Sequence, residues 1–190
     1  VGGRHVAYGD GIYKSDNGGK NWKNMGLKKT EHISKIIVHP ENSNIVWVAA
    51  QGPLWKKGGQ RGVYKTIDGG KNWKKVLGNS QWTGATDILV DPRDSDVLYA
   101  ATWDRHRTVA ALMGGGPGSG IHKSVDGGET WKKLYKGLPN DQDSNGDGEI
   151  DEDDLPTVNM GKIGLAISPQ NPDVLYAAIE LERTTGGVYK

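Results

Sequence analysis

The stretch GVYKTIDGGKNW (residues 62–73) decides the fold, because the chain repeats it. Further copies are GIYKSDNGGKNW (11–22) and GIHKSVDGGETW (120–131), and GVYK (187–190) matches the start of the unit. A second unit alternates with it, as IIVHPENSNIVWVAA (36–50), ILVDPRDSDVLYAAT (88–102) and LAISPQNPDVLYAAI (165–179). Each unit has the pattern of two short strands around a turn rich in Gly, Pro, Asn or Asp. The two hairpins together predict a four-stranded antiparallel sheet that recurs every 51 to 58 residues.

Radial repetition of four-stranded sheets produces a β-propeller, and no long helical pattern interrupts the repeat. We therefore expect an all-β chain, an incomplete arc of about three to four blades from a larger propeller. The expected parts are a partial first blade (1–27), a second blade (28–79), a third blade (80–137), an insertion (138–160) and a partial fourth blade (161–190).

Composition limits the partners of the chain. The sequence has 24 basic and 23 acidic residues and no basic run, so we expect no nucleic-acid partner. No apolar stretch is long enough to span a bilayer, so we expect no direct membrane insertion. The absence of cysteine removes disulfides, zinc–thiolate sites and thiol catalysis.

The repeated turns share a residue pattern with a chemical purpose. A hydroxyl and a carboxylate or amide oxygen can accept the amide protons of the turn, Gly can adopt positive φ, and Trp can fill the space between sheets. The pattern comprises Ser15, Asn17, Gly19 and Trp22 in one copy, Thr66, Asp68, Gly70 and Trp73 in the next, and Ser124, Asp126, Gly128 and Trp131 in the third. It resembles the Asp-box of bacterial-neuraminidase repeats. Because every blade carries it, we assign it to the scaffold.

Longer stretches carry a second resemblance. AAQGPLWKKGGQRGVYKT (49–66) and GGGPGSGIHKSVDGGETW (114–131) are similar to sortilin-like propellers of large secreted bacterial proteins that are labelled glycosyl hydrolases. The resemblance implies a secreted or cell-surface location, bacterial origin, and a glycan or polypeptide ligand besides the rest of the propeller. It indicates the fold more firmly than the activity.

The variable segments of the repeat are expected to lie on one face. If the strands of a blade are lettered A to D from the axis outward, the B–C and D–A connections lie opposite the repeated turns. Their lengths vary: the span from the turn Trp to the next repeat Pro is 18 residues in one copy (Trp22 to Pro40) and 38 in another (Trp131 to Pro169). Variable loops on a regular scaffold are typical of a binding surface.

Aromatic and charged residues without repeat partners gather in these connections. They are Trp55, Trp82 and Trp103, with the adjoining segment Asp104, Arg105, His106 and Arg107. Flat indole faces suit stacking on sugars or peptide side chains, so we assign these seven residues to ligand binding. The alternative is that the indoles pack beneath their own loops.

An enzymatic alternative needs two facing carboxylates. The candidates for a glycoside hydrolase are Asp87 and Asp104, and no pattern in the sequence shows that they converge. We favour a module that binds a glycan or polypeptide. The first alternative is a polysaccharide hydrolase completed by blades outside this chain, and a second is an assembly factor that grips another protein through the same face.

The insertion contains DSNGDGEIDEDD (143–154), whose spacing resembles an EF-hand calcium loop and most closely that of dockerins. The expected ligands are Asp143, Asn145, Asp147, the carbonyl of Glu149, Asp151 and Asp154, with Gly148 at the sharp turn. Nearby prolines discourage flanking helices, so we expect calcium to bind a lone loop in a structural role. Magnesium fits such a loop less well, and a merely solvated acidic loop is the alternative.

Overall fold

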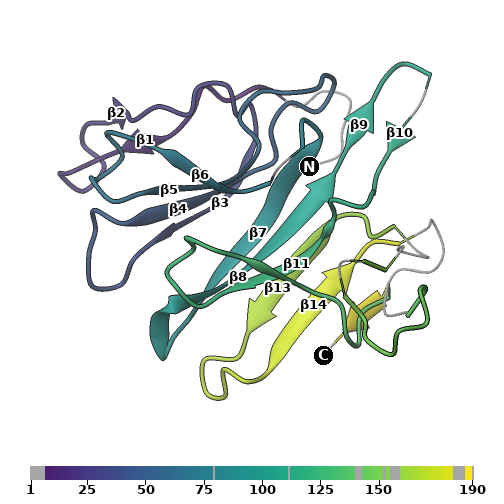
Figure 1. The fold of residues 1–190 in the computed structure, drawn as a ribbon. Coiled ribbons are helices and arrows are strands. Elements are labelled where there is room, and N and C mark those ends of the chain that lie inside the picture. Colours follow the sequence, from purple (N-terminus) through teal and green to yellow (C-terminus); the bar gives the residue numbers. More distant parts are fainter. Residues whose placement is uncertain are drawn as a thin grey trace.

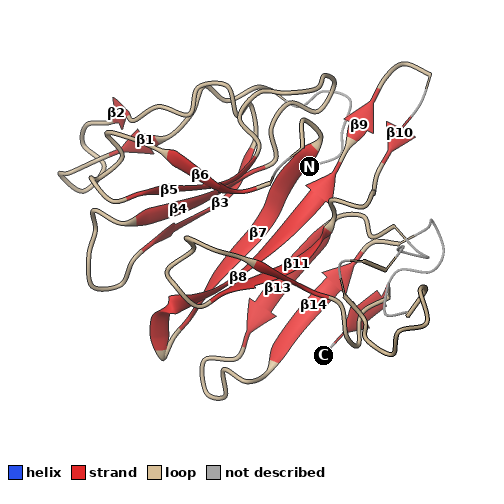
Figure 2. Ribbon diagram, in the orientation of Figure 1, coloured by secondary structure: helices blue, strands red, loops and turns tan. Residues whose placement is uncertain are grey.

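The computed structural model describes residues 7–78, 80–110, 112–139, 143–151, 153–154, 159–181 and 187–189. Throughout these residues the regular structure is strand, which confirms the all-β prediction (Figure 2). No helix in this part of the chain is long and apolar enough to cross a membrane. Residues 1–6, expected to belong to the first blade, lie outside the described part.

Fifteen strands make up the described structure. They are β1 (Tyr13–Lys14), β2 (Lys23–Asn24), β3 (Ile33–Val38), β4 (Val46–Ala50), β5 (Gly62–Thr66), β6 (Lys74–Leu77), β7 (Thr83–Asp91), β8 (Asp94–Asp104), β9 (His106–Arg107), β10 (Leu112–Met113), β11 (Gly120–Ser124), β12 (Lys132–Leu134), β13 (Ile163–Ile167), β14 (Leu175–Ile179) and β15 (Gly187–Tyr189).

The sheets follow the predicted order of strands. The second and third sheets along the chain have four strands each, in the orders β3-β4-β5-β6 and β7-β8-β11-β12. The fourth sheet has the order β13-β14-β15. Strands β1 and β2 form a pair at the start, and β9 and β10 form a small separate hairpin. The inner strand β7 contacts both β3 and β13, so successive sheets stand beside one another as an arc of propeller blades (Figure 1).

Each repeated turn is closed by the same hydrogen bonds. In the β5–β6 turn Thr66 Oγ1 donates to Asp68 (2.7 Å) and accepts from the amide of Gly70 (3.0 Å), while Asp68 also accepts from the amide of Asn72 (2.9 Å). These bonds hold the pKa of Asp68 down at about 2, with the Asn72 amide as the largest cause. Gly70 has a φ of 91°, which a side chain would oppose. The geometry matches the role expected of the pattern, and membership of the Asp-box family stays a prediction.

The turn tryptophans differ in their packing. Trp73 donates its indole N–H to the carbonyl of Met25 in the preceding segment (2.7 Å), and Trp131 packs against the core that contains Trp47. These two fill the space between sheets, as predicted. Trp22 is 63% exposed and bonds only within its own turn, to Gly19, because no sheet precedes β1 and β2 in the described residues.

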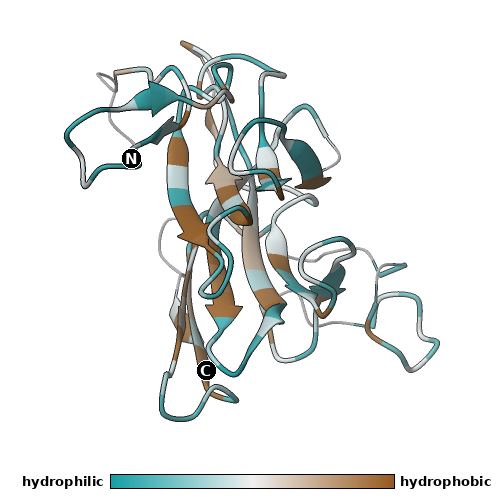
Figure 3. Ribbon diagram, turned by 90° about the vertical axis from the view of Figure 1, so that its left-hand side faces the viewer, coloured by the Kyte–Doolittle hydropathy of each residue, from teal (hydrophilic) through white to brown (hydrophobic). Residues whose placement is uncertain are grey.

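The core lies between the sheets. One cluster joins the second and third sheets around Trp47, Val63, Ile88 and Leu98, and another joins the third and fourth around Ile121, Met160 and Ile163. Figure 3 shows the apolar residues gathered on the central strands and polar residues on the loops at their ends. The indole of Trp47 also donates to the carbonyl of Gly127 in the next sheet's turn (2.9 Å). Side-chain packing therefore fixes each blade against its neighbour.

A partly buried histidine in the third sheet is expected to make stability depend on pH. His122 occupies the strand position that Tyr64 holds in the second sheet, and its Nδ1 is buried without a partner. Burial, aided by the nearby charge of Lys133, lowers the pKa of His122 to about 4. The unfolded chain therefore takes up a proton below about pH 6.5, where the folded chain does not.

We predict that protonation of His122 in the unfolded chain lowers the free energy of unfolding by about 2 kcal/mol as the pH drops from about 6.5 to about 4. Replacing His122→Tyr, the residue type of Tyr64, should remove that part of the dependence. Urea unfolding of both proteins at a series of pH values measures it. Parallel curves for the two proteins would show that His122 contributes nothing, and His39→Tyr, at a partly exposed turn position, serves as the control.

Candidate functional site

Strand pairing places the variable connections opposite the repeated turns. In the second sheet Val46 pairs with Thr66 at the turn end, while Ala50 pairs with Gly62 at the other end, where the loop 51–61 begins. In the third sheet Leu98 pairs with Ser124 and Thr102 with Gly120, so β9 leaves β8 at the end away from the turn (Figure 1). The predicted separation of the two faces is confirmed for these sheets.

A buried arginine organises the loop between β4 and β5. The guanidinium of Arg61 is 1% exposed and donates to five backbone carbonyls. The acceptors are Gly58 (2.8 Å), Gln51 (3.2 Å), Trp82 (3.5 Å), Lys56 (2.5 Å) and Pro53. Four of these acceptors belong to loop 51–61, and the fifth belongs to the connection that leads into β7. One side chain therefore joins two neighbouring loops.

Charge burial at Arg61 has an electrostatic consequence. Loss of water lowers the pKa of Arg61 to about 10, against the raising effect of Glu31. The group stays protonated at neutral pH, and the carbonyl dipoles replace its hydration. Gly52 makes this arrangement possible, because a Cβ at that position would lie 2.1 Å from Cγ of Arg61.

Two tryptophans stand on this face beside cationic or titratable groups. Cζ of Arg107 lies 4.9 Å from the ring centroid of Trp55, and the rings of Trp82 and His106 meet edge to face at 4.2 Å. Trp55 is 37% exposed and Trp82 is half-buried. We call Trp55, Trp82, His106 and Arg107 the rim cluster. It combines two aromatic surfaces from loops with the imidazole and guanidinium of β9.

The remaining predicted ligand residues lie beneath the rim cluster. Trp103 is 7% exposed, belongs to β8, and donates its indole N–H to the carbonyl of Gly114 (2.8 Å). Its expected position in a loop is wrong, because the β7–β8 pairing continues as far as Asp104. Arg105, 5% exposed, covers the Trp103 ring at 4.8 Å. These two side chains support the surface and do not form it.

Both carboxylates proposed for catalysis are engaged in the scaffold. Asp104 accepts from Thr83 Oγ1 (2.6 Å) and from the amide of Gly118 (2.8 Å), which ties the β8 end to the loop before β11. Asp87 pairs with Lys35 (2.9 Å) and accepts the amide of Leu165 (2.9 Å), which links three successive inner strands. Each group has a stabilising role in the described structure.

The acidic insertion is closed by its last residue. Asp154 accepts the amides of Ser144 (2.7 Å) and Asp151 (3.0 Å), and these bonds, with Asp151 as the largest cause, lower its pKa. Asp143 accepts the amides of Gly146 (2.5 Å) and Gly148 (2.8 Å). Among the residues that the structure describes here, no three acidic side chains are gathered at one point. The carboxylates of Asp143 and Asp154 therefore bond to backbone amides of the loop, and calcium binding stays a prediction.

Three buried polar residues gave no signal in the sequence. Arg61 stands directly before the repeated GxYK strand, and a charged residue there is expected to be exposed. His32 and Gln51 stand next to strands and belong to no motif. Only the burial in the structure separates them from solvent-exposed polar residues. A fully buried arginine with several hydrogen bonds is uncommon in proteins. Arg61 therefore distinguishes this loop from the other connections of the repeat.

The fold and the arrangement of its loops define an array of propeller blades with the variable loops along one rim. The sequence profile of the Sortilin-Vps10 family, described as sortilin, neurotensin receptor 3, matches residues 10–155. The chain belongs to that family. No curated protein matches the chain.

Several solved structures share the fold. An ancestral GH74 enzyme has 18% identity and a TM-score of 0.59, and the match covers 91% of this chain and 19% of that enzyme. The Niastella koreensis GH74 enzyme has 19% identity and a TM-score of 0.60, with 90% of this chain and 22% of that enzyme covered. The GH74 xyloglucanase from Xanthomonas campestris has 15% identity and a TM-score of 0.61, with 95% of this chain and 25% of that enzyme covered. At these identities the likeness shows the propeller fold alone. The chain spans about a quarter or less of the length of those enzymes.

Proposed function

We propose that the protein is a secreted propeller module that binds a glycan through the rim cluster. The observation that carries the proposal is the exposed indole of Trp55, held by the loop that Arg61 anchors and flanked by the guanidinium of Arg107. Sugar rings present apolar C–H faces and hydroxyl edges, which suit an indole beside hydrogen-bond donors. Likeness to propellers of the GH74 enzymes supports a carbohydrate ligand over the polypeptide alternative.

A polysaccharide hydrolase remains the second candidate, and the GH74 likeness favours it. Its catalytic pair would combine blades outside this chain with groups on this face. The bonding of Asp87 and Asp104 argues against their acting as acid and base, because each carboxylate already accepts scaffold hydrogen bonds at 2.6–2.9 Å. We therefore place binding ahead of catalysis.

Calcium belongs to the proposal as a structural ion. Loop 143–154 supplies carboxylate and amide oxygens of the kind that calcium prefers, and Gly148, with a φ of 86°, forms the required turn. Asp154 already joins the two ends of the loop by accepting the amide of Ser144, and Asp143 accepts the amide of Gly148 at the turn. Ion binding would exchange some of these amide bonds for metal ligands and remove the repulsion among the carboxylates. A calcium-rich exterior would suit this loop, in agreement with secretion.

A glycan array with the protein tests the rim cluster. We expect binding to plant and bacterial polysaccharide fragments, xyloglucan oligosaccharides among them, and a loss of at least about tenfold in affinity for Trp55→Ala, because a stacked aromatic contributes on the order of 1.5 kcal/mol. The matched control is Trp22→Ala, an exposed tryptophan on the opposite face, which should bind like the unaltered protein.

Equal losses in Trp55→Ala and Trp22→Ala would place the ligand elsewhere. The same oligosaccharides should be incubated with the protein and their reducing ends counted. Release of reducing ends that depends on Asp104, measured with Asp104→Asn, would establish the hydrolase and displace the binding module.

Calorimetric titration tests the calcium loop. After removal of metal ions we expect calcium to bind with an affinity between about micromolar and millimolar, and Asp143→Ala with Asp147→Ala should abolish the heat. Asp16→Ala, an exposed carboxylate in the first turn, is the control. The absence of binding at millimolar calcium, or binding that survives the double substitution, would refute the assignment.

A further inference from the structure

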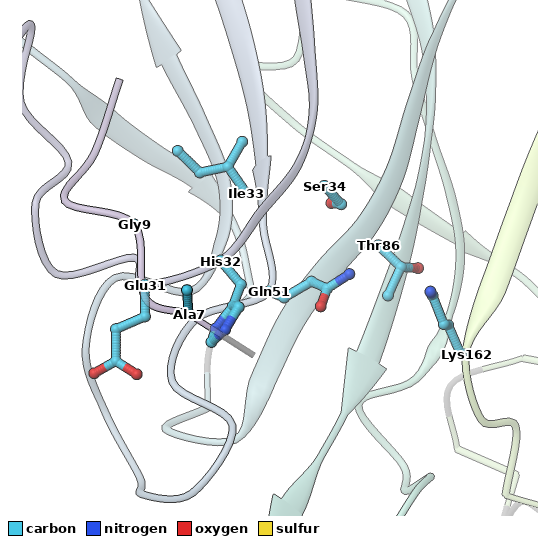
Figure 4. A pocket seen from close by; sticks show the side chains of 9 residues that line it. All are labelled: Ala7, Gly9, Glu31, His32, Ile33, Ser34, Gln51, Thr86 and Lys162. Carbon is cyan, nitrogen blue, oxygen red and sulfur yellow. The ribbon is translucent and has the colours of Figure 1, made fainter. Parts of the chain in front are cut away.

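An apolar groove of about 330 Å³ opens between the first strand pair and the second sheet, at the turn end of β3. The apolar side chains that line it include Ile12, Met25, Ile36, Val38, Val46 and Trp73. The cavity at the opposite end of β3 is different, because polar side chains such as Glu31, His32 and Lys162 line most of it (Figure 4). The groove therefore suits an apolar occupant.

The repeat shows what fills this position between the next two sheets. Ile36 and Ile88 occupy the same strand position in the second and third sheets. Ile88 is fully buried in a core cluster that contains the indole of Trp47 from the preceding sheet, whereas Ile36 is 48% exposed. Val90 packs against the same cluster, whereas its counterpart Val38 is 51% exposed. The groove is therefore the counterpart of the space that Trp47 fills.

The turn beside the groove repeats the surface on which Trp47 rests. Trp47 donates its indole N–H to the carbonyl of Gly127 (2.9 Å) and lies against Gly128, where a Cβ would stand 3.1 Å from the indole nitrogen. Gly69 and Gly70 hold the same two positions in the β5–β6 turn, and both line the groove. These glycines leave room for a flat ring beside the turn.

A lysine is placed to cover an incoming ring. Nζ of Lys65 lies 5.9 Å from the ring centroid of Trp47, and Nζ of Lys123 lies 5.4 Å from that of Tyr99. In both sheets the lysine pairs across the strands with the aromatic residue. Lys14 holds the same position in β1 and lines the groove. Among the strands that the structure describes, β1 pairs with β2 alone, so its other edge is open to a further strand.

We propose that the groove receives an aromatic side chain from the inner hairpin (strands A and B) of a further propeller blade. Strand B of that blade pairs antiparallel with the open edge of β1 and has the pattern of IVWVAA (45–50) or VLYAAT (97–102). Its aromatic residue lies opposite Lys14, and an indole at this position donates to the carbonyl of Gly69. Residues 1–6 contain no Trp, Tyr or Phe, so their sequence does not supply such a ring.

A glycan satisfies the groove less well than a strand. Apolar walls offer few partners to sugar hydroxyls, and the open edge of β1 needs a backbone partner. The groove lies at the turn end of the sheets, whereas the rim cluster lies at the other end. The proposal is therefore independent of glycan binding.

Calorimetric titration of the full chain with a synthetic peptide of residues 36–50 tests the proposal, because this inner hairpin carries Trp47. We expect an affinity on the order of 100 μM, and binding at least about tenfold weaker for the same peptide with Trp47→Ala. Saturating peptide should also raise the midpoint of thermal unfolding, since it binds the folded chain.

A charge placed in the groove of the protein provides the second arm. Ile36→Lys should weaken binding of the unaltered peptide at least about tenfold, whereas Val125→Lys, at an exposed apolar position in the turn of the third sheet, should leave it unchanged. Thermal unfolding checks that both variants fold.

Three results would overturn the proposal. The first is no binding at about 1 mM peptide or equal binding of the two peptides. The second is an equal effect of Ile36→Lys and Val125→Lys. The third is self-association of the chain that Tyr176→Ala abolishes, because Tyr176 is 44% exposed at the strand position of Trp47 and would then fill the groove from a second copy.

Discussion

The face that carries the variable loops depends on one buried guanidinium. Arg61 holds the carbonyls of Gln51, Pro53, Lys56, Gly58 and Trp82, and so fixes both the loop that carries Trp55 and the connection that carries Trp82. A charge buried at 1% exposure is tolerable only because so many dipoles replace water. The same bonds fix the backbone of Gln51, which directly follows β4. The positions of Trp55 and Trp82 therefore depend on one side chain.

The scaffold beneath this face is assembled by repetition. The turn of each sheet is closed by one hydroxyl and one acidic or amide oxygen, and indoles then join neighbouring sheets, as Trp73 joins Met25 and Trp47 joins Gly127. Inner strands are tied further by Asp87, which bonds to both Lys35 and Leu165. Such contacts between neighbours make the blades a stiff base on which loops of different length can vary.

The sequence predicted the repeated part of the molecule well and the site only in outline. Strand order, the turns and the separation of faces follow from local patterns that recur, so Thr66 and Asp68 could be placed before any coordinates were known. Burial depends on packing across sheets and leaves no local pattern. We therefore assigned Trp103 and Arg105 to ligand binding although both are buried. No sequence pattern indicated that His32, Gln51 and Arg61 are buried. The bonds that engage Asp87 and Asp104 in the scaffold could not be predicted, because their partners come from distant segments.

Hydrogen–deuterium exchange measured by mass spectrometry on Arg61→Met tests the central claim, that Arg61 organises the ligand face. Amides in residues 51–61 should exchange at least about tenfold faster than in the unaltered protein, while those of β4 and β5 stay protected. Arg93→Met is the control, because Arg93 is half exposed and its pairs with Asp91 and Asp173 lie on the turn face. Unchanged exchange in residues 51–61 of Arg61→Met would contradict the account.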